Sequence, residues 1–185
     1  MRIVAGSAKG RALTGPKPSS GHIRPTADRV RETIFNMLGQ FLDGQAVLDL
    51  YAGTGALGLE ALSRGAGRLV LVDQDREALA LCRKNTDALG FGAQVSILAQ
   101  PVARAVETLG KQGEKFELVF ADPPYAARVV ETVLEAVVAA ALVTPGGMVV
   151  VEHDKREAAP DAHAGLTLED QRRFGDTLVS FYRAP

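Results

Sequence analysis

The sequence predicts an α/β fold in which a mostly parallel sheet is covered by helices on both faces. Three observations support this prediction. The first two are that short, continuously apolar segments alternate with longer amphipathic ones, and that a glycine-rich turn follows the first apolar segment. The third is the end of the chain, where two strand-like segments, residues 166–174 and 177–182, are joined by Gly175-Asp176. This pattern is typical of a β-hairpin, so the sheet is expected to end in antiparallel strands.

The composition is that of one globular domain. Hydrophobic residues make up 46% of the 185 residues and the formal net charge is −1, which excludes a disordered chain. Cys82 is the only cysteine, so a disulfide-stabilised scaffold is excluded. No apolar run is long enough to cross a membrane, and residues 1–6 lack the apolar segment of a signal peptide. We therefore expect a cytoplasmic protein with no membrane partner, and we expect it to be a monomer.

The charge is distributed unevenly along the chain. Residues 1–40 hold seven Lys or Arg and two acids, a local net charge of +5, so the remainder carries −6. A basic segment joined to an acidic body suggests a polyanionic partner that meets one end of the molecule. We accordingly divide the chain into a basic N-terminal extension, residues 1–42, and a domain, residues 43–185. Judged by charge alone, the excess of basic residues is explained equally well by a basic face that is only exposed to solvent.

The extension is expected to form a hairpin followed by a helix. Residues 3–4 and 12–13 are separated by glycines and could pair as short strands. Between residues 30 and 42, apolar side chains recur at spacings of three and four, which predicts an amphipathic helix. Thr26 is the expected N-cap of that helix.

The domain continues as alternating strands and helices. The expected strands are residues 46–50, 68–72, 94–98, 116–121 and 148–151, and the expected helices are residues 56–64, 76–89, 102–109 and 127–142. Because the strands are apolar throughout, both faces of the sheet should be covered.

The first chemical motif follows the first expected strand, where residues 49–58 read DLYAGTGALG. Glycines at such a turn let the backbone pass close to a ligand, and the helix N-terminus offers free N–H groups. Asp73 lies twenty residues after Gly53, at the end of the second strand, where an acid suits the two hydroxyls of a ribose. The motif therefore predicts a nucleoside-containing cofactor. The predicted contacts in the loop are Asp49, Ala52, Gly53, Thr54 and Gly55.

Asp49 favours S-adenosylmethionine over a nicotinamide cofactor. It ends the first strand four residues before Gly53, where a carboxylate would repel a pyrophosphate but suits an ammonium or sulfonium group. In addition, no substrate-binding domain follows the sheet, as most dehydrogenases would need. We therefore predict S-adenosylmethionine as the cofactor.

The second motif, Asp122-Pro123-Pro124-Tyr125, follows the fourth expected strand and predicts the catalytic residues. Strands one and four can face one crevice at their carboxyl ends, where ligands of such sheets bind. An exocyclic amine on a base is a poor nucleophile, because its lone pair is delocalised into the ring. The Asp122 carboxylate and the Pro123 carbonyl can accept hydrogen bonds from that amine and orient it. The prolines hold the loop rigid, and Tyr125 offers a ring on which the base can stack.

On these motifs, the sequence resembles class I methyltransferases that act on exocyclic amines. More narrowly, it resembles the bacterial 16S ribosomal RNA guanine-N2 methyltransferases of the RsmD type, over almost the whole chain. The stretches that carry this resemblance are RIVAG and KGR at residues 2–6 and 9–11, RPTADRVRETIFN at residues 24–36, AGTGALGLEALSR at residues 52–64, and FGDT at residues 174–177 before Tyr182.

The resemblance implies a Rossmann-like methyltransferase fold with a seven-stranded sheet, which agrees with the expected terminal hairpin. It implies methylation of N2 of a single guanine, of the guanine 966 type, in 16S rRNA within an assembled or partly assembled small ribosomal subunit. Gln100, after the third strand, would accept a hydrogen bond from the adenine amine of the cofactor. The basic residues expected to contact RNA phosphates are Lys9, Arg11, Arg24, Arg29 and Arg31.

Other functions stay open on the sequence. Asp-Pro-Pro-Tyr also serves DNA adenine-N6 methylation, although the chain leaves no room for a separate target-recognition domain. A non-catalytic RNA-binding module could keep the same fold, although both intact motifs argue against it, and a small nicotinamide oxidoreductase is a more distant alternative. No spacing of Cys, His and acidic residues suggests a metal site, so no metal is expected. Asp75 and Glu152 are interpreted as structural residues that could border the site.

Overall fold

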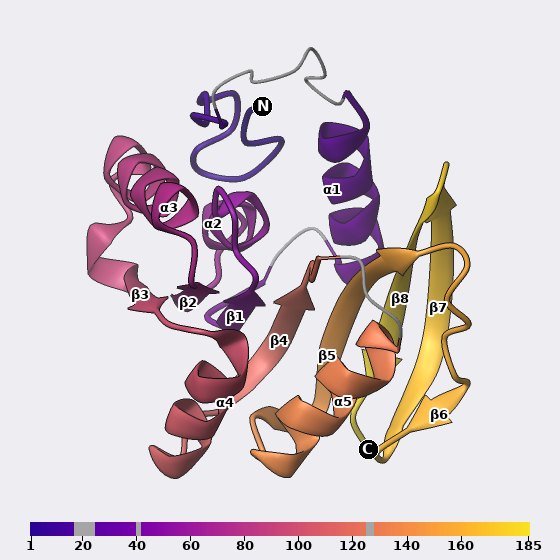
Figure 1. Cartoon of the computed structure of the whole chain (residues 1–185). Helices are drawn as coiled ribbons and strands as arrows, with labels where there is room; N and C mark the ends of the chain where they lie inside the picture. The colour runs from indigo at the N-terminus through magenta and orange to yellow at the C-terminus, as the bar shows by residue number, and fades with distance from the viewer. Residues whose placement is uncertain (17–24, 40–41, 125–127) are drawn as a thin grey trace.

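In the computed structural model, eight strands of the described residues form one central sheet (Figure 1). The structure describes residues 1–16, 25–39, 42–124 and 128–185, with the backbone alone for residues 25–28. The strands are β1 (Ala46–Leu50), β2 (Arg68–Asp73), β3 (Val95–Ala99), β4 (Phe116–Ala121), β5 (Val143–Asp154), β6 (Ala162–His163), β7 (Leu166–Phe174) and β8 (Thr177–Arg183). They lie in the order β3-β2-β1-β4-β5-β8-β7-β6.

The sheet is parallel from β3 to β5 and antiparallel beyond. β1 pairs in parallel with β2 and β4, and β4 pairs in parallel with β5. β8 runs antiparallel to both β5 and β7, which confirms the predicted terminal hairpin with Gly175-Asp176 at its turn. β5 is longer than predicted, since its pairing with β8 continues past the apolar run to Asp154. The structure also adds β6 to the seven expected strands; two residues are too short to show a periodicity.

The helices cover the two faces of the sheet. In the described part of the chain they are α1 (Pro25–Leu38), α2 (Ala56–Ser63), α3 (Arg76–Leu89), α4 (Val102–Lys111) and α5 (Val129–Ala139), with the 3₁₀ turn η1 (Gly92–Gln94). α1, α2 and α3 lie on one face together with the N-terminal residues, and α4 and α5 lie on the other (Figure 1). The predicted α/β fold class is thus confirmed.

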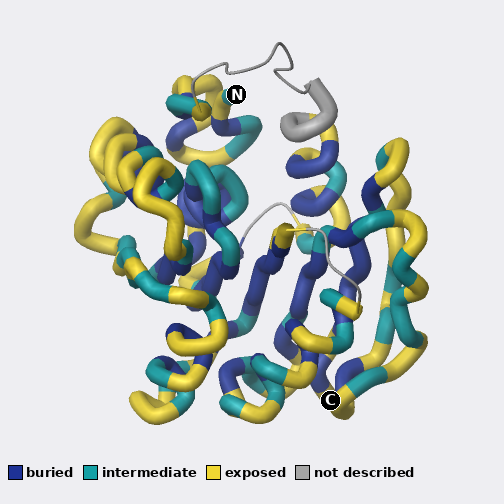
Figure 2. Tube along the Cα trace, in the orientation of Figure 1, coloured by how far each residue is buried: buried dark blue, intermediate teal, exposed yellow. Residues whose placement is uncertain are grey.

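The central strands are buried on both faces, which explains their apolar sequences (Figure 2). In β1, Val47 packs with residues of α1 and α2, whereas Leu48 and Leu50 pack with residues of α4 and α5. Successive side chains of a strand point to opposite faces. Asp49 therefore points to the side of the sheet that carries α1 and α2.

The site is positioned by the neighbouring strands β1 and β4. The chain runs from β1 to β2 and β3 on one side, and then returns to β4 on the other side of β1. Such a reversal opens a crevice at the carboxyl ends of the two strands. Because Leu50 pairs with Ala121, the residues that follow them, Tyr51 and Asp122, leave the sheet at the same level. Both motifs predicted from the sequence therefore begin at this crevice.

α1 begins and ends earlier than predicted. Thr26, the expected N-cap, is the second residue of the helix, because the helix starts at Pro25. The fixed φ of proline and its missing N–H suit the first helical position. The helix therefore begins before the position that an N-cap at Thr26 predicts. At the other end, Gly39 has a φ of +96°, so the buried Leu42 lies beyond the helix.

The N-terminal hairpin is reduced to an isolated antiparallel bridge between Arg2 and Ala12. Backbone hydrogen bonds at 3.0 Å from Ile3 N to the Arg11 carbonyl, and at 2.8 Å from Gly10 N to the Ile3 carbonyl, hold the same two segments together. The segment turns against α2 at Gly6, which has a φ of +80°. A Cβ there would lie 1.7 Å from the carbonyl oxygen of Ser63, so this close contact requires glycine.

Candidate active site

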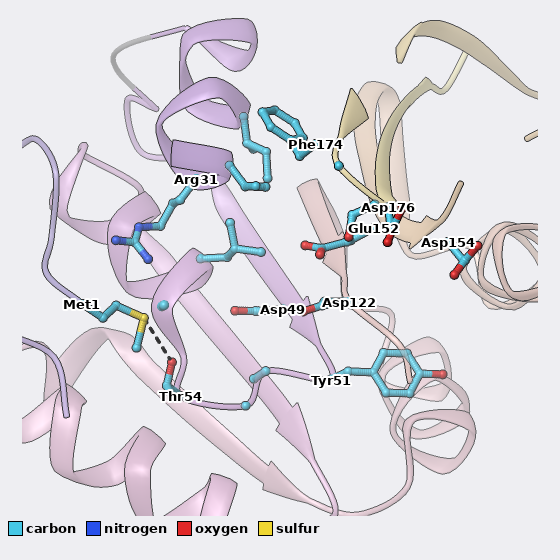
Figure 3. Close-up of a pocket in the computed structure, with 18 of the residues that line it drawn as sticks. Met1, Arg31, Asp49, Tyr51, Thr54, Asp122, Glu152, Asp154, Phe174 and Asp176 are labelled. Atoms are coloured by element: carbon cyan, nitrogen blue, oxygen red, sulfur yellow. Dashed lines mark hydrogen bonds between the residues drawn. The ribbon is translucent and has the colours of Figure 1, made fainter. Parts of the chain in front are cut away.

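A cleft of about 710 Å³ opens at the carboxyl ends of β1, β4 and β5 (Figure 3). One end is formed by the glycine loop after β1 and by Met1. The other end is formed by the end of β5 and by the turn between β7 and β8, with Phe174. Val30 and Ile34 of α1 line the side, and Asp122 lies between the two ends. The cleft thus brings both predicted motifs together with residues from the two ends of the chain.

The loop after β1 requires glycine at two positions. Gly53 and Gly55 have φ angles of +55° and +76°. A Cβ at Gly55 would lie 3.2 Å from Leu71 Cδ1 and 3.3 Å from Leu59 Cδ1, so a side chain would push the loop away from the sheet. Gly53 lines the cleft, and a Cβ there would meet only the carbonyl oxygen of Tyr51, at 4.0 Å. The loop therefore presents bare backbone to a ligand at the N-terminus of α2.

The Asp49 carboxylate lies under this loop and is 3% exposed. Its Oδ2 accepts a hydrogen bond of 2.9 Å from Gly58 N, in the first turn of α2. The N-cap of that helix, Gly55, has no side chain to accept such a bond, so Asp49 caps the helix from the strand. Burial raises the pKa of Asp49 to about 8; the Gly58 N–H opposes this shift, and the charges of Asp122 and Asp73 add to it.

Asp73, at the end of β2, holds the glycine loop in place. Its Oδ2 accepts a hydrogen bond from Gly53 N and its Oδ1 accepts one from Asp75 N, both at 2.9 Å. Each carboxylate oxygen has a further lone pair, so both can still accept from a ligand hydroxyl. Gln100 lies beside it, because its backbone N donates to the Asp73 carbonyl at 3.0 Å. The two residues predicted for the nucleoside are thus brought together next to Gly53, although neither lines the cleft itself.

The loop after β4 carries the predicted catalytic motif. Asp122 is exposed and lines the cleft, and its backbone N lies 3.4 Å from the Leu50 carbonyl to which it donates. Pro123 is buried and Pro124 is exposed, while Tyr125 lies outside the described residues. Asp122 and Asp49 are close enough for the charge of Asp122 to raise the pKa of Asp49 (Figure 3).

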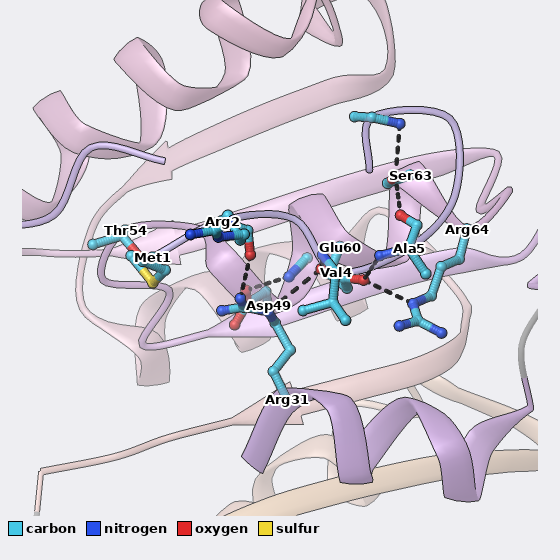
Figure 4. Close-up of polar contacts among 12 residues, drawn as sticks. Met1, Arg2, Val4, Ala5, Arg31, Asp49, Thr54, Glu60, Ser63 and Arg64 are labelled. Atoms are coloured by element: carbon cyan, nitrogen blue, oxygen red, sulfur yellow. Dashed lines mark hydrogen bonds and ion pairs between the residues drawn. The ribbon is translucent and has the colours of Figure 1, made fainter. Parts of the chain in front are cut away.

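The N-terminal segment is attached to α2 by Glu60, a fully buried carboxylate (Figure 4). Its two oxygens accept hydrogen bonds from Val4 N at 2.8 Å and from Ala5 N at 2.9 Å. The Nε atoms of Arg31 and Arg64 lie 3.4 Å and 2.9 Å from the same carboxylate. Both arginines are buried, so this network places three charged side chains inside the molecule.

The five residues predicted to contact RNA phosphates are therefore not equivalent. Lys9 and Arg29 are exposed. Arg11 is exposed as well, but its guanidinium donates to two carbonyl groups at the C-terminal end of α3. Arg31 is 3% exposed and faces the buried carboxylate described above. Arg24 lies outside the described residues.

Asn85 of α3 joins the N-terminal segment to the glycine loop. It is buried, its Oδ1 accepts a hydrogen bond of 2.7 Å from Thr14 N, and its Nδ2 donates to the Thr14 and Thr54 carbonyls at 3.0 Å and 2.9 Å. Met1 lines the cleft, with its Sδ 4.0 Å from Thr54 Oγ1. The N-terminal segment, which the sequence associates with RNA alone, therefore also forms part of the cofactor end of the cleft.

Several residues of the cleft were given no catalytic, cofactor-binding or RNA-binding role by the sequence. They are Met1, Tyr51, Glu152, Asp154, Arg156, Phe174 and Asp176. Tyr51 carries a usable signal, because it stands in the strand-to-helix turn, where the structure gives it a φ of +61°. Glu152 lies within β5, directly after the apolar run of residues 148–151. Asp75, interpreted as structural, is the N-cap of α3 and accepts a hydrogen bond of 2.8 Å from Ala78 N.

Comparison with known proteins assigns the chain to a family. The family model described as Conserved hypothetical protein 95 matches residues 1–183. The chain belongs to this family. Its resemblance to the RsmD type is confirmed by the Escherichia coli (strain K12) protein Ribosomal RNA small subunit methyltransferase D, which is 32% identical over 99% of this chain and 89% of the relative.

Two further members of the comparison cover the whole fold. YlbH of Bacillus subtilis (strain 168), named as a candidate rRNA methyltransferase, is 34% identical over 99% of this chain and 98% of its own. Among solved structures, the Escherichia coli protein yhhF, described as a candidate methyltransferase, superposes with a TM-score of 0.85 at 30% identity, over 100% of this chain and 97% of that chain. This chain therefore shares its architecture from end to end with that Escherichia coli structure.

The described part of the chain contains neither a membrane-spanning helix nor a cluster of metal-binding side chains. None of its helices is both long enough and apolar enough to span a membrane. Among the same residues, no group of three or more His, Cys, Asp or Glu side chains is arranged to hold a metal ion.

Glu60→Ala should lower the free energy of unfolding by about 3 to 5 kcal/mol, because it removes the carboxylate with which the buried Arg31 and Arg64 form ion pairs. Denaturant unfolding followed by circular dichroism measures this change. Glu107→Ala, at an exposed position on α4 where Glu107 pairs with Lys111, is the matched control and should leave the midpoint unchanged. Equal midpoints for the two variants would contradict the importance of the buried network.

Asp49→Asn should remove a pH-dependent loss of stability. With a folded-state pKa of about 8 against the usual 3.8, the native protein retains a proton that the unfolded chain releases. The contribution of this group to the free energy of unfolding therefore falls as the pH rises from about 4 to 8. Asparagine does not ionise, so the free energy of unfolding of the variant relative to the wild type should increase across this window. Denaturation curves at several pH values test this; a constant difference would argue against the raised pKa.

Proposed function

We propose that the chain is an S-adenosylmethionine-dependent methyltransferase that modifies the exocyclic N2 amine of a single guanine, of the guanine 966 type, in 16S rRNA. The observation that carries this proposal is that the glycine loop, tied to Asp73, and the loop of Asp122 open into one cleft. Two relatives are named for methylation of rRNA, one of them for the small ribosomal subunit, which supports the class of substrate. We further propose a monomeric cytoplasmic enzyme that acts on an assembled or partly assembled subunit.

The residues at one end of the cleft fit S-adenosylmethionine. The bare backbone at Gly53 allows a close approach, and Asp73 beside it can accept hydrogen bonds from the ribose hydroxyls. Gln100, next to Asp73, would accept from the adenine amine. Asp49 would face the positively charged methionine end, where a cation favours the ionised form of the carboxyl. Ala52, Thr54 and Gly55 of the glycine loop are assigned to the same cofactor. When bound, the cofactor supplies a methyl group on a positively charged sulfur.

In the proposed reaction, the cofactor held by the glycine loop and Asp73 would supply its methyl group to N2 and would retain the electron pair of the carbon–sulfur bond. The N2 amine would release one of its protons to water. Asp122 and the Pro123 carbonyl accept hydrogen bonds from the amine and direct its lone pair towards the methyl group, Pro124 holds the loop, and Tyr125 stacks on the base. The rate enhancement comes from alignment and electrostatics, without a covalent bond to the protein.

The extension, residues 1–42, is proposed to face the RNA. Lys9, Arg11 and Arg29 are exposed and can contact phosphates, and Arg24 is assigned with them on the sequence. For Arg31 the geometry favours a structural role over the predicted phosphate contact, because its guanidinium faces Glu60 inside the molecule.

Transfer of a radiolabelled methyl group tests the proposed function. The substrates are small-subunit particles that lack the modification, naked 16S rRNA and duplex DNA, with nucleoside analysis of the products. N2-methylguanosine at one site in rRNA is the expected product. N6-methyladenine in DNA would instead support the adenine methyltransferase, and binding of cofactor without any transfer would support the non-catalytic module.

Asp122→Ala should lower kcat about 100-fold or more while leaving the Kd of S-adenosylmethionine nearly unchanged, because Asp122 is assigned to the amine and not to the cofactor. Single-turnover methyl transfer measures the rate, and calorimetry measures the Kd. An equal loss of turnover and of cofactor binding would remove Asp122 from this role.

Asp73→Ala should act first on cofactor binding. Loss of hydrogen bonds from the ribose hydroxyls to a carboxylate predicts a Kd at least about tenfold higher, with a smaller effect on kcat at saturating cofactor. Calorimetric titration with S-adenosylmethionine measures this change. An unchanged affinity would rule out the assignment of Asp73 to the ribose.

A further inference from the structure

We propose that Glu152 selects guanine, by accepting a hydrogen bond from N1–H of the target base while Asp122 accepts one from its N2 amine. The base would lie between these acids and an apolar wall formed by α1 and Phe174. This inference rests on the proposed function and extends it, since it assigns the specificity of the same cleft to a residue outside both sequence motifs.

The two acids lie at the same level of neighbouring strands, Asp122 directly after β4 and Glu152 within β5. Ala121 of β4 pairs with Val151 of β5, and Asp122 and Glu152 are the residues that follow this pair. Neighbouring strands lie about 4.8 Å apart, so two side chains at one level can reach adjacent atoms on the edge of one flat ligand.

Both acids also point to the same side of the sheet. Phe120 and Val150, two residues before them on their strands, belong to the cluster that includes Ile34 of α1. Side chains two residues apart on a strand share a face. Asp122 and Glu152 therefore face the α1 side, where both line the cleft.

The wall of the cleft near these acids is apolar. Val30 and Ile34, which are one helical turn apart on α1, line it together with Phe174 at the end of β7. Figure 3 shows Phe174 at the same end of the cleft as Glu152, away from Met1 and Thr54. An aromatic ring and two aliphatic side chains suit the faces of a planar base, whereas the two carboxylates suit an edge that carries donors.

Guanine matches this arrangement, because its N1–H and its N2 amine are neighbouring donors. Adenine and cytosine place an unprotonated ring nitrogen next to their amine, and its lone pair would face a carboxylate. Sites built to hydrogen-bond a donor discriminate strongly against analogues that lack it, because the acceptor of the site is left unpaired. Glu152 thus distinguishes the base, while Asp122 orients the amine that reacts.

The test replaces the target guanine by 2-aminopurine, which keeps the amine at C2 but has an acceptor at N1. The substrate is 16S rRNA ligated from a synthetic fragment and reconstituted into small-subunit particles. The wild type should favour guanine by at least about 100-fold in kcat/KM. Glu152→Gln should reduce this preference at least tenfold, because the amide can donate to the N1 acceptor. Glu107→Gln, the same substitution at an exposed position on α4, should keep the wild-type preference.

Two further measurements separate the possible outcomes. The first is the Kd of S-adenosylmethionine, which should be unchanged in Glu152→Gln if this variant is folded. The second uses the variant Glu152→Ala, which should slow transfer to guanine more than transfer to 2-aminopurine. If both Glu152 variants retain the wild-type preference, Glu152 does not recognise N1–H and the inference is wrong. If the wild-type protein forms no N2-methylguanosine, the proposed function itself fails.

Discussion

The hydrogen bond from Gly58 N to Asp49 is the constraint on which the site depends. It joins the end of β1 to the first turn of α2, so the glycine loop between them is fixed at both ends. This hydrogen bond requires the Asp49 carboxylate to be buried away from water and near the charges of Asp122 and Asp73. Both effects destabilise the ionised form and raise the pKa of Asp49. A positively charged ligand in the cleft would offset this cost, because it stabilises the ionised carboxylate. The Asp49 carboxyl group that fixes the glycine loop would therefore also favour the binding of a cation in the cleft.

A second buried carboxylate, that of Glu60, explains why the N-terminal segment packs against α2. This carboxylate forms ion pairs with two buried arginines and accepts hydrogen bonds from two backbone N–H groups of the segment. Ile3 and Leu13 enter the same hydrophobic cluster as Val47 and Leu59. Through Asn85 the segment reaches the glycine loop as well. If the proposed function is correct, the segment that would meet RNA and the loop that would hold the cofactor are therefore in direct contact.

The distribution of charge separates affinity from selectivity. Exposed basic residues of the extension can attract a polyanion without regard to its sequence. Inside the cleft the charges are mostly negative, with Asp49, Asp122 and Glu152 on one face of three strands. Carboxylates there repel phosphate and accept hydrogen bonds from amines. In the proposed function, the outer surface would therefore attract RNA in general, whereas the interior of the cleft would select the donor-rich edge of a base.

The sequence by itself determined the elements and the two motifs, because both are local. The bounds of β1, β4 and α3 follow from apolar periodicity, and residues 49–58 and Asp122 stand directly after their strands. Only the tertiary structure decided which charges face inward and what completes the cleft. Arg31 looks like a surface base in the sequence, yet Glu60, in another helix, holds it inside. Glu152 and Phe174 meet in one cleft because β7 runs in the same direction as β5, with β8 antiparallel between them. Met1 reaches the cleft because the N-terminal segment is bound to α2. These are relations between distant residues that no local pattern records.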